Sequence, residues 1–173
     1  MRLFVAFRVP EDSLKKVQGE FNFDGLKLVR EFHCTLKFLG EVNEEDVEMI
    51  REKLRGVRFV AFEAGFSDVG AFPNADYTRV VWVGLEPVDK ICELQREVEK
   101  SLAGMFEKEE RFKPHVTIAR VKFVKDKRML KQKLESKINV EGKFKVDRVL
   151  LMKSELRRDG PVYEVVEEYM LNM

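Results

Sequence analysis

The sequence predicts an α+β fold in which two pseudo-symmetric lobes, built mainly from antiparallel strands, flank a central groove. Strand and helix signals alternate in the order strand, helix, strand, helix, strand, and this order occurs twice with a period near 80 residues. Each copy also contains one His-x-Thr tripeptide. The chain has 173 residues, of which 45% are hydrophobic, so it can bury a substantial core. We expect a single bilobal domain over 1–173, with pseudo-repeats at about 1–76 and 77–173.

The first copy is recognised by apolar runs that alternate with helical patterns. Pro10 suits the first turn of a helix, Asn43 suits a helix N-cap, and Gly40 is typical of a strand end. Apolar residues in both helices recur every three or four positions, which indicates one buried face. The expected elements are a strand at Leu3–Val9, a helix after Pro10, a strand at Glu31–Leu39, a helix after Asn43 and an extended segment at Phe59–Val69.

The second copy begins with another apolar run, and Pro87 again follows its first strand. The turn signal Asp159-Gly160-Pro161 separates the last two strands. The expected elements are a strand at Val80–Leu85, a helix after Pro87, a strand at Arg111–Val121, a helix over 126–138, and strands at Lys143–Lys153 and Val162–Leu171. A groove between the two sheets is the natural place for a ligand.

Charge is spread unevenly along the chain, although the formal net charge is only +1. Residues 111–158 hold 16 Lys and Arg against 5 Asp and Glu, a net of +11, which leaves −10 for the remainder. A basic half suits a docked polyanion, and Lys122 to Lys133 and Arg157-Arg158 are candidates for contacting its backbone. The alternative is the solvated surface of a highly charged protein, and charge alone leaves both open. The Lys- and Glu-rich composition also resembles that of proteins from hot habitats.

Several protein classes do not fit the sequence. No apolar run approaches the roughly eighteen residues that a membrane span needs. The apolar start at 1–7 is too short for a signal peptide, because charged residues follow at once. Cys34 and Cys92 lie far apart without metal-type spacing, which indicates reduced thiols. We therefore expect a cytoplasmic protein without membrane partners.

Both histidines of the chain stand in matching tetrapeptides, His33-Cys34-Thr35-Leu36 and His115-Val116-Thr117-Ile118, 82 residues apart. The chain has only three threonines, so chance seldom gives both histidines a threonine two positions later. Residues i and i+2 of a strand point to the same face. Each imidazole therefore shares a face with a hydroxyl, while the residues between and after them point into apolar packing.

This arrangement suits cleavage of a phosphodiester. Imidazoles titrate near neutral pH, so one can accept a proton while the other donates one. Hydroxyls can donate hydrogen bonds to phosphoryl oxygens and stabilise the charge of a pentacoordinate phosphorus. His33 and His115 are thus candidate catalytic residues, and Thr35 and Thr117 are candidate phosphate-binding residues.

Other interpretations of the histidines fit less well. A lone His on a strand is usually a structural residue, but two in matching tetrapeptides favour a shared role. Two histidines without clustered Cys or carboxylates fall short of the ligands that zinc takes, and no HExxH, P-loop or GxGxxG motif is present. Nucleophilic catalysis by Cys34 is disfavoured because that side chain alternates away from His33. We predict neither a metal nor a cofactor.

The motifs resemble those of the 2H phosphoesterases, and within them the bacterial and archaeal RNA 2′,3′-cyclic phosphodiesterase branch, also called 2′-5′ RNA ligase. The resemblance covers essentially the whole chain. It rests on Arg2-Leu3-Phe4-Val5-Ala6-Phe7, His33-Cys34-Thr35-Leu36-Lys37-Phe38-Leu39-Gly40, Val81-Trp82-Val83-Gly84-Leu85, Phe112-Lys113-Pro114-His115-Val116-Thr117-Ile118-Ala119-Arg120, Lys153-Ser154-Glu155-Leu156 and Gly160-Pro161-Val162-Tyr163.

The resemblance implies a bilobal fold with its active site in the central cleft and no metal requirement. It implies hydrolysis of RNA ends or nucleotides bearing a 2′,3′-cyclic phosphate to a 2′-phosphate, with a reversible 2′-5′ joining of RNA ends at the same site. By analogy, His115 is the general base and His33 protonates the departing 3′-oxygen. The near-symmetry of the site leaves these two roles exchangeable.

Further substrate-binding candidates depend on details of strand geometry. Lys37 shares the face of His33 if the strand stays regular, and could contact phosphate. Arg120 is suggested by the family motif, but strict alternation turns it away unless a bulge intervenes. Tyr77, Phe112 and Phe72 are candidates for stacking on an unpaired base, although most Phe residues must belong to the core.

Competing functions remain open at this level. One is a phosphodiesterase for a small nucleotide such as ADP-ribose cyclic phosphate, and another is an exonuclease that trims RNA 3′ ends. A third, from a different class, is a non-catalytic protein that binds RNA ends through the basic half. Two paired imidazoles argue against the third, since a binding protein has no need of them. The closed two-lobed design leads us to expect a monomer.

Overall fold

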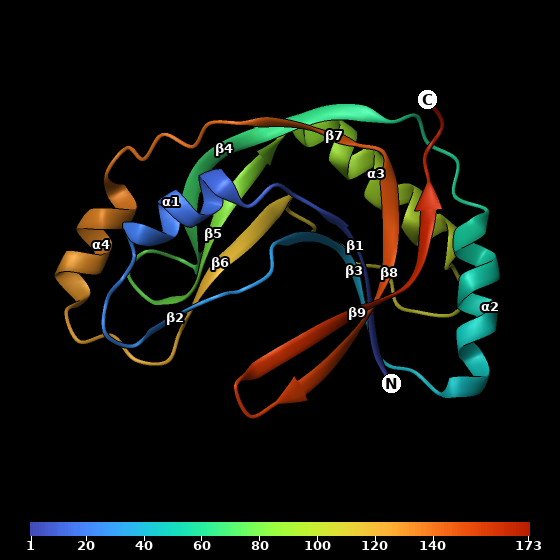
Figure 1. Cartoon of the computed structure of the whole chain (residues 1–173), viewed down its shortest axis with the longest axis horizontal. Helices are drawn as coiled ribbons and strands as arrows, with labels where there is room; N and C mark the ends of the chain where they lie inside the picture. Colours follow the sequence, from blue (N-terminus) through green and yellow to red (C-terminus); the bar gives the residue numbers. More distant parts are fainter.

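Two antiparallel sheets form the body of the molecule in the computed structural model, which describes residues 1–173 (Figure 1). The first sheet has the order β3-β1-β8-β9, and the second has the order β2-β6-β5-β4-β7. The predicted α+β class with two antiparallel sheets is therefore confirmed. The strands are β1 (Arg2–Arg8), β2 (Leu26–Leu28), β3 (His33–Glu41), β4 (Phe62–Pro73), β5 (Thr78–Glu86), β6 (His115–Val121), β7 (Lys143–Val146), β8 (Arg148–Arg157) and β9 (Gly160–Met170).

Each sheet contains strands from both halves of the sequence. β4 leaves the first half and pairs with β5, while β8 and β9 return from the second half to pair beside β1. One continuous core of 35 buried residues joins the sheets. Because the two halves exchange strands, neither sheet is complete without the other half of the chain. The division into repeats at about 1–76 and 77–173 stays a prediction about sequence.

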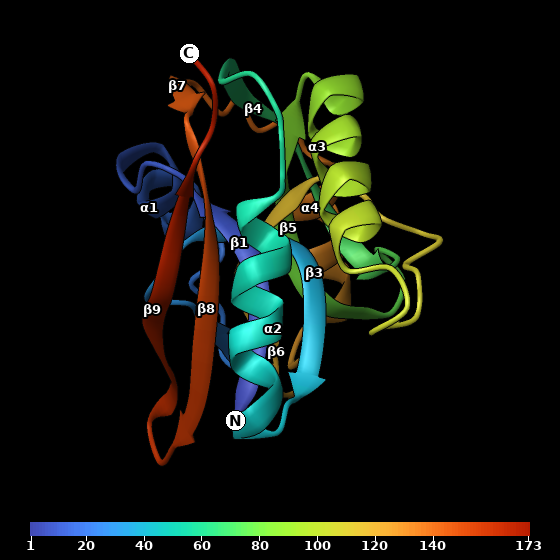
Figure 2. The same cartoon turned by 90° about the vertical axis from the view of Figure 1, so that its right-hand side faces the viewer.

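Four helices cover the outer sides of the sheets. They are α1 (Asp12–Gly19), α2 (Glu44–Arg55), α3 (Val88–Ser101) and α4 (Lys127–Glu135). α1 packs against β6 and α4 against β4, whereas α2 packs against β9 and α3 against β3 and β5. Figure 2 shows α2 and α3 side by side on the flank opposite α1 and α4. No helix in the structure has the length and apolar character needed to cross a membrane.

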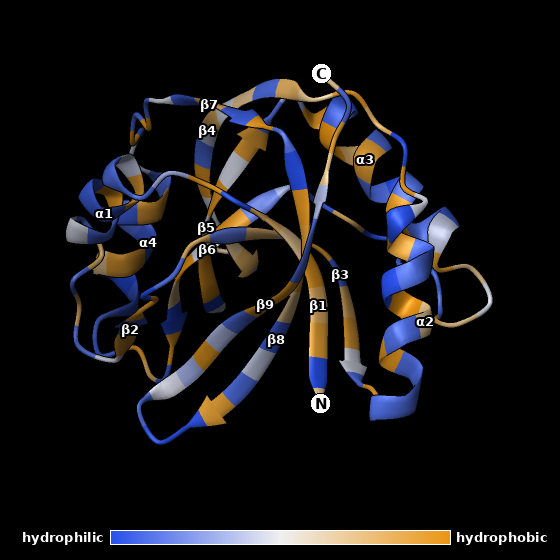
Figure 3. Cartoon of the chain, turned by 45° about the vertical axis from the view of Figure 1, so that its right-hand side comes forward, coloured by the Kyte–Doolittle hydropathy of each residue, from blue (hydrophilic) through white to orange (hydrophobic).

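Hydrophobic patterning explains how the helices attach. The buried stripe of α3 consists of Ile91, Leu94 and Val98, and Leu102 at the end of the helix continues it. In Figure 3 hydrophobic residues run along β1 at the centre of the molecule, while α2 alternates between hydrophobic and hydrophilic bands. Asp126 caps α4 by accepting a hydrogen bond from the Met129 backbone N–H at 3.0 Å.

Two elements differ from the sequence prediction. β2 was not predicted, because three residues are too few to show a period. The single strand expected at Lys143–Lys153 is wrong, because the chain changes sheets at Asp147: β7 pairs with β4, and β8 pairs with β1. Apolar residues on both sides of this point hide the change in the sequence.

Candidate active site

The two His-Thr pairs lie on equivalent strands of the two sheets. In β3, His33 pairs opposite Arg8 and Thr35 opposite Ala6 of β1. In β6, His115 pairs opposite Gly84 of β5 two residues before Thr117. The intervening side chains, Cys34 and Val116, are fully buried on the opposite face. The i, i+2 alternation of a strand thus turns each imidazole and its hydroxyl to the same side.

A β-bulge follows each threonine at the same place. In β3 the pairing with β1 moves from Thr35 directly to Lys37, and in β6 the pairing with β5 moves from Thr117 directly to Ala119. One extra residue in a strand reverses the alternation beyond it. The two bulges therefore turn Phe38 of β3 and Arg120 of β6, at corresponding positions, toward the pocket that the histidines line.

Both pairs line one pocket of about 450 Å³, which we call the histidine pocket. Its volume lies within the range of small-molecule sites. Its wall combines the two imidazoles, the two threonines, positive and negative side chains and aromatic rings. The lining residues are Arg2, Phe4, Val29, Glu31, His33, Thr35, Phe38, His115, Thr117, Arg120, Ser154, Leu156, Pro161 and Tyr163.

The His33 ring is enclosed by two aromatic rings. The centroids of Phe4 and Tyr163 each lie 5.0 Å from its own, and Tyr163 meets it edge-on at 84°. Desolvation by these neighbours lowers the pKa of His33 to about 4, and the positive charges of Arg120 and Arg8 act in the same direction. In the unliganded protein His33 is therefore neutral at pH 7.

His115 is held differently. Its Nδ1 lies 2.6 Å from the Lys113 carbonyl oxygen, and the edge of its ring meets Phe72 at a centroid distance of 4.9 Å. A carbonyl oxygen can only accept, so Nδ1 carries the hydrogen and Nε2 keeps the lone pair. Burial lowers the pKa of His115, the Lys113 carbonyl partly opposes this, and the charges of Lys113 and Arg120 lower it again.

Besides Arg2, three groups in the pocket are free to bind an anion. Neither Thr35 nor Thr117 uses its hydroxyl in a hydrogen bond within the protein, and the Arg120 guanidinium has no ion-pair partner. The charge of Arg120 reaches both imidazoles and the Tyr163 phenol, since it lowers the pKa of each. Two hydroxyl donors and one cation thus face the space between the histidines.

Comparison with known proteins assigns the chain to a family. A family model described as the 2'-5' RNA ligase superfamily matches residues 7–158. The chain belongs to the 2'-5' RNA ligase superfamily. Among its relatives, proteins named RNA 2',3'-cyclic phosphodiesterase come from Methanocaldococcus jannaschii, 37% identical over 98% of this chain and all of that protein, and from Thermotoga maritima, 36% identical over 97% and 94%.

Solved structures with a similar fold agree with this family assignment. The crystal structure of a Thermus thermophilus protein is similar with a TM-score of 0.84 and 29% identity, covering 98% of this chain and 97% of that one. The structure of Escherichia coli LigT in its apo form has a TM-score of 0.76 at 22% identity, covering 99% and 98%. The latter likeness concerns the fold alone.

Lys37, expected in the pocket of this superfamily member, lies elsewhere. Its side chain is 4% exposed and its Nζ donates to both carboxylate oxygens of Glu99 at 2.9 Å and to the Glu107 carbonyl at 2.7 Å. The expectation that Lys37 shares the face of His33 is wrong, because the bulge after Thr35 turns Lys37 inward and Phe38 outward. The same bulge geometry in β6 explains why Arg120 does reach the pocket.

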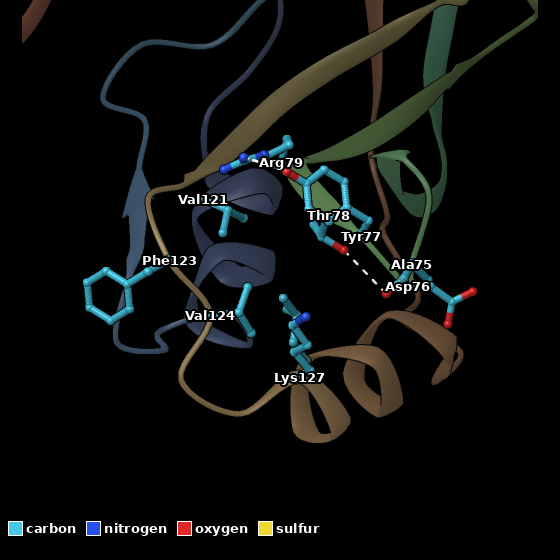
Figure 4. A pocket seen from close by; sticks show the side chains of 10 residues that line it. Ala75, Asp76, Tyr77, Thr78, Arg79, Val121, Phe123, Val124 and Lys127 are labelled. Atoms are coloured by element: carbon cyan, nitrogen blue, oxygen red, sulfur yellow. Dashed lines mark hydrogen bonds between the residues drawn. The ribbon is translucent and has the colours of Figure 1, made fainter.

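The aromatic candidates have different positions. Tyr77 lines a separate pocket of about 140 Å³ near α4, where its hydroxyl accepts a hydrogen bond from Arg79 (Figure 4). Phe112 is half-buried and packs against the core. Phe72 contacts the His115 ring without lining the histidine pocket. The structure therefore brings neither Tyr77 nor Phe112 to the two histidines.

The sequence reasoning missed the aromatic wall of the pocket. Phe4 and Tyr163 stand in motifs quoted for the family resemblance, yet the residue pattern gave no sign that they enclose His33. The acidic residue at the pocket, Glu31, was predicted only as the first residue of a strand; it lies two residues before β3 begins, and nothing in the sequence indicated that it lines the pocket. No three His, Cys, Asp or Glu side chains in the structure are grouped as a metal site requires.

Much of the basic stretch from Lys122 to Lys133 is neutralised within the protein. Lys125 pairs with Asp24, Lys131 with Asp76, and Lys133 with Glu20. These pairs account for part of the excess charge counted from the sequence. Two arginines line the histidine pocket without an ion-pair partner, Arg2 and Arg120, and only the charge of Arg120 lowers the pKa of both imidazoles.

Proposed function

We propose that this chain hydrolyses the terminal 2′,3′-cyclic phosphate of RNA to a 2′-phosphate. The observation that carries the proposal is the convergence of two His-Thr pairs and an unpaired arginine on one pocket. Relatives 34% to 39% identical, which bear the name RNA 2',3'-cyclic phosphodiesterase, support the same activity. The reaction adds water across a phosphorus–oxygen bond, so it needs one group to accept a proton and another to donate one.

His115 is the general base in this proposal. The hydrogen bond from its Nδ1–H to the Lys113 carbonyl leaves Nε2 as the acceptor, and its lowered pKa keeps it neutral at pH 7. Nε2 takes a proton from water while the water oxygen attacks phosphorus. The support is geometric, since a fixed tautomer aims one lone pair at the pocket.

His33 is the general acid. The bond between phosphorus and the ribose 3′-oxygen breaks as His33 donates a proton to that oxygen, which leaves a 3′-hydroxyl and a 2′-phosphate. His33 is neutral in the empty pocket. An anionic cyclic phosphate bound beside it offsets the repulsion from Arg120 and Arg8, which raises the pKa of His33 and lets it carry the proton.

Thr35, Thr117 and Arg120 stabilise the transition state. The two hydroxyls donate to the non-bridging oxygens, and Arg120 offers charge-assisted hydrogen bonds as negative charge accumulates on them. A 5′-hydroxyl of RNA can take the place of water in the same site, which gives a 2′-5′ linkage and is the reverse of its cleavage. Water is in large excess, so hydrolysis dominates.

An end-group assay tests this proposal. An oligoribonucleotide ending in a 2′,3′-cyclic phosphate is incubated in EDTA with the wild type, His33→Ala and His115→Ala. The expected result is a full-length product with a 2′-phosphate, and a loss of about 10²–10⁴ in rate for each variant. Shortened products would indicate a trimming nuclease instead, and bound but unreacted RNA would indicate a non-catalytic binding protein.

A further inference from the structure

A second pocket of about 220 Å³, which we call the side pocket, opens beside the histidine pocket. The two have six lining residues in common, among them Glu31, Arg120 and Tyr163, so they adjoin each other. Lys27, Arg30 and other residues line the side pocket alone. The side pocket is therefore an extension of the site rather than a separate cavity.

The hairpin of β8 and β9 closes one side of this pocket by reaching the other sheet. It projects past β1 toward β2 (Figure 1), and Lys27 Nζ of β2 donates to the Asp159 carbonyl oxygen at 2.8 Å. Gly160 has a φ of +120°, and a Cβ there would lie 3.1 Å from Lys27 Nζ. Glycine thus permits both the turn and the close contact.

The chemistry of the side pocket suits a nucleotide. Arg30 is exposed and has no ion-pair or hydrogen-bond partner in the protein, and the partner of Lys27 is an uncharged carbonyl. Glu31 and Asp159 also line this pocket, and a carboxylate can accept hydrogen bonds from hydroxyl or amino groups. Leu156, 81% exposed, adds an apolar surface.

We infer that the side pocket binds the nucleotide preceding the cyclic phosphate end, with Arg30 contacting the phosphodiester that joins the two. This rests on the proposed function. In the last nucleotide the cyclic phosphate occupies both the 2′- and 3′-oxygens, so the chain continues only through the 5′-phosphate. That anionic linkage must leave the histidine pocket, and the side pocket offers a connected route with an unpaired cation. The first free 2′-hydroxyl also belongs to this preceding nucleotide, where RNA differs from DNA.

The test compares 2′,3′-cyclic AMP with the dinucleotide ApA ending in a 2′,3′-cyclic phosphate, and with the same dinucleotide carrying an uncharged methylphosphonate linkage. We expect wild-type kcat/KM to be about tenfold higher for the phosphodiester dinucleotide than for the mononucleotide, as loss of one charge-assisted hydrogen bond would produce. Arg30→Ala should lower only the dinucleotide value, by about tenfold. With the neutral linkage, wild type and Arg30→Ala should be equal.

Arg96→Ala on α3 is the matched control, since Arg96 is also exposed and unpaired but lines neither pocket. If Arg30→Ala lowers turnover of the mononucleotide as much as that of the dinucleotide, or leaves both unchanged, the inference is overturned while the proposed function stands. If the wild type turns over neither substrate, both fall. A higher kcat/KM for ADP-ribose cyclic phosphate than for the dinucleotide, abolished by Arg30→Ala, would overturn the assignment to RNA.

Discussion

Strands β3 and β6 carry the same His-Thr pair in different surroundings. Both place a histidine, a threonine and a bulge in the same order, and both turn the residue three positions beyond the threonine toward the pocket. That residue is Phe38 in β3 and Arg120 in β6. His33 is enclosed by aromatic rings, whereas His115 is tied to a backbone carbonyl.

In the proposed mechanism, this difference lets a near-symmetric site support an asymmetric reaction. Each of the two strands supplies an imidazole and a hydroxyl to the same pocket. The surroundings that differ between the two histidines, aromatic rings at His33 and a backbone carbonyl at His115, then separate the roles of acid and base. Under this proposal the fixed tautomer suits His115 to accept a proton, and an anionic substrate raises the lowered pKa of His33 so that it can donate one.

The largest effect should separate the two histidines. If the departing 3′-oxygen of the substrate is replaced by sulfur, the leaving group departs as a thiolate and needs no proton. His33→Ala should then recover most of the activity that it loses with the oxygen substrate, about 10²–10⁴, whereas His115→Ala should recover none. Single-turnover rates on both substrates provide the measurement.

The opposite pattern, with recovery in His115→Ala, would exchange the two roles. Equal recovery in both variants would mean that neither histidine acts as a dedicated acid. Thermal unfolding of each variant controls for damage to the fold.

The next effect concerns stability, and it tests the buried residue two positions after the threonine, which differs between β3 and β6. Ala119 occupies in β6 the place that Lys37 occupies in β3. Lys37→Met should lower the free energy of unfolding by about 3–5 kcal/mol, because it leaves the Glu99 carboxylate buried without its cation. Urea denaturation measures this loss. The double variant Lys37→Met with Glu99→Leu should be more stable than Lys37→Met, and a still less stable double variant would contradict this account.

A smaller effect should follow from Arg120→Gln. Loss of the cation should lower kcat by about a hundredfold, as removal of one donor to developing charge does. Since Arg120 lowers the pKa of His33 and of His115, its removal should raise both values, which NMR titration of the two imidazoles can measure. Arg96→Gln should change neither. Unaltered imidazole titrations in Arg120→Gln would show that its charge does not reach the histidines.

The smallest effect is a shift in the pH profile. Activity requires a neutral His115, so it rises as the pH increases through the pKa of His115. It also requires a protonated His33, so it falls as the pH increases through the pKa of His33. Both pKa values lie below the usual 6.5 in the free protein, so kcat/KM should be highest below pH 6.5. Bound substrate raises the pKa of His33, so the basic limb of kcat should lie at higher pH than that of kcat/KM. Coincident limbs would contradict this effect of the substrate.

Several of these features could be predicted from the sequence. The apolar periods of the helices and the duplicated His-x-Thr pattern indicated two sheets and the four central residues of the pocket. The prediction of strand boundaries failed where the local hydrophobic pattern does not show which strands pair. The single strand expected at Lys143–Lys153 divides at Asp147, because strand pairing is decided by partners far away in the sequence.

The sequence by itself determined the alternation of strands and helices, the buried faces and the matching of His33 with His115, because these depend on short-range periodicity. Only the tertiary structure decided that Lys37 turns toward the protein interior and Arg120 toward the histidine pocket, because a bulge exists only relative to a paired strand. It also decided that the β8–β9 hairpin reaches Lys27 and builds the side pocket. That contact joins residues 132 positions apart, and no local pattern records it.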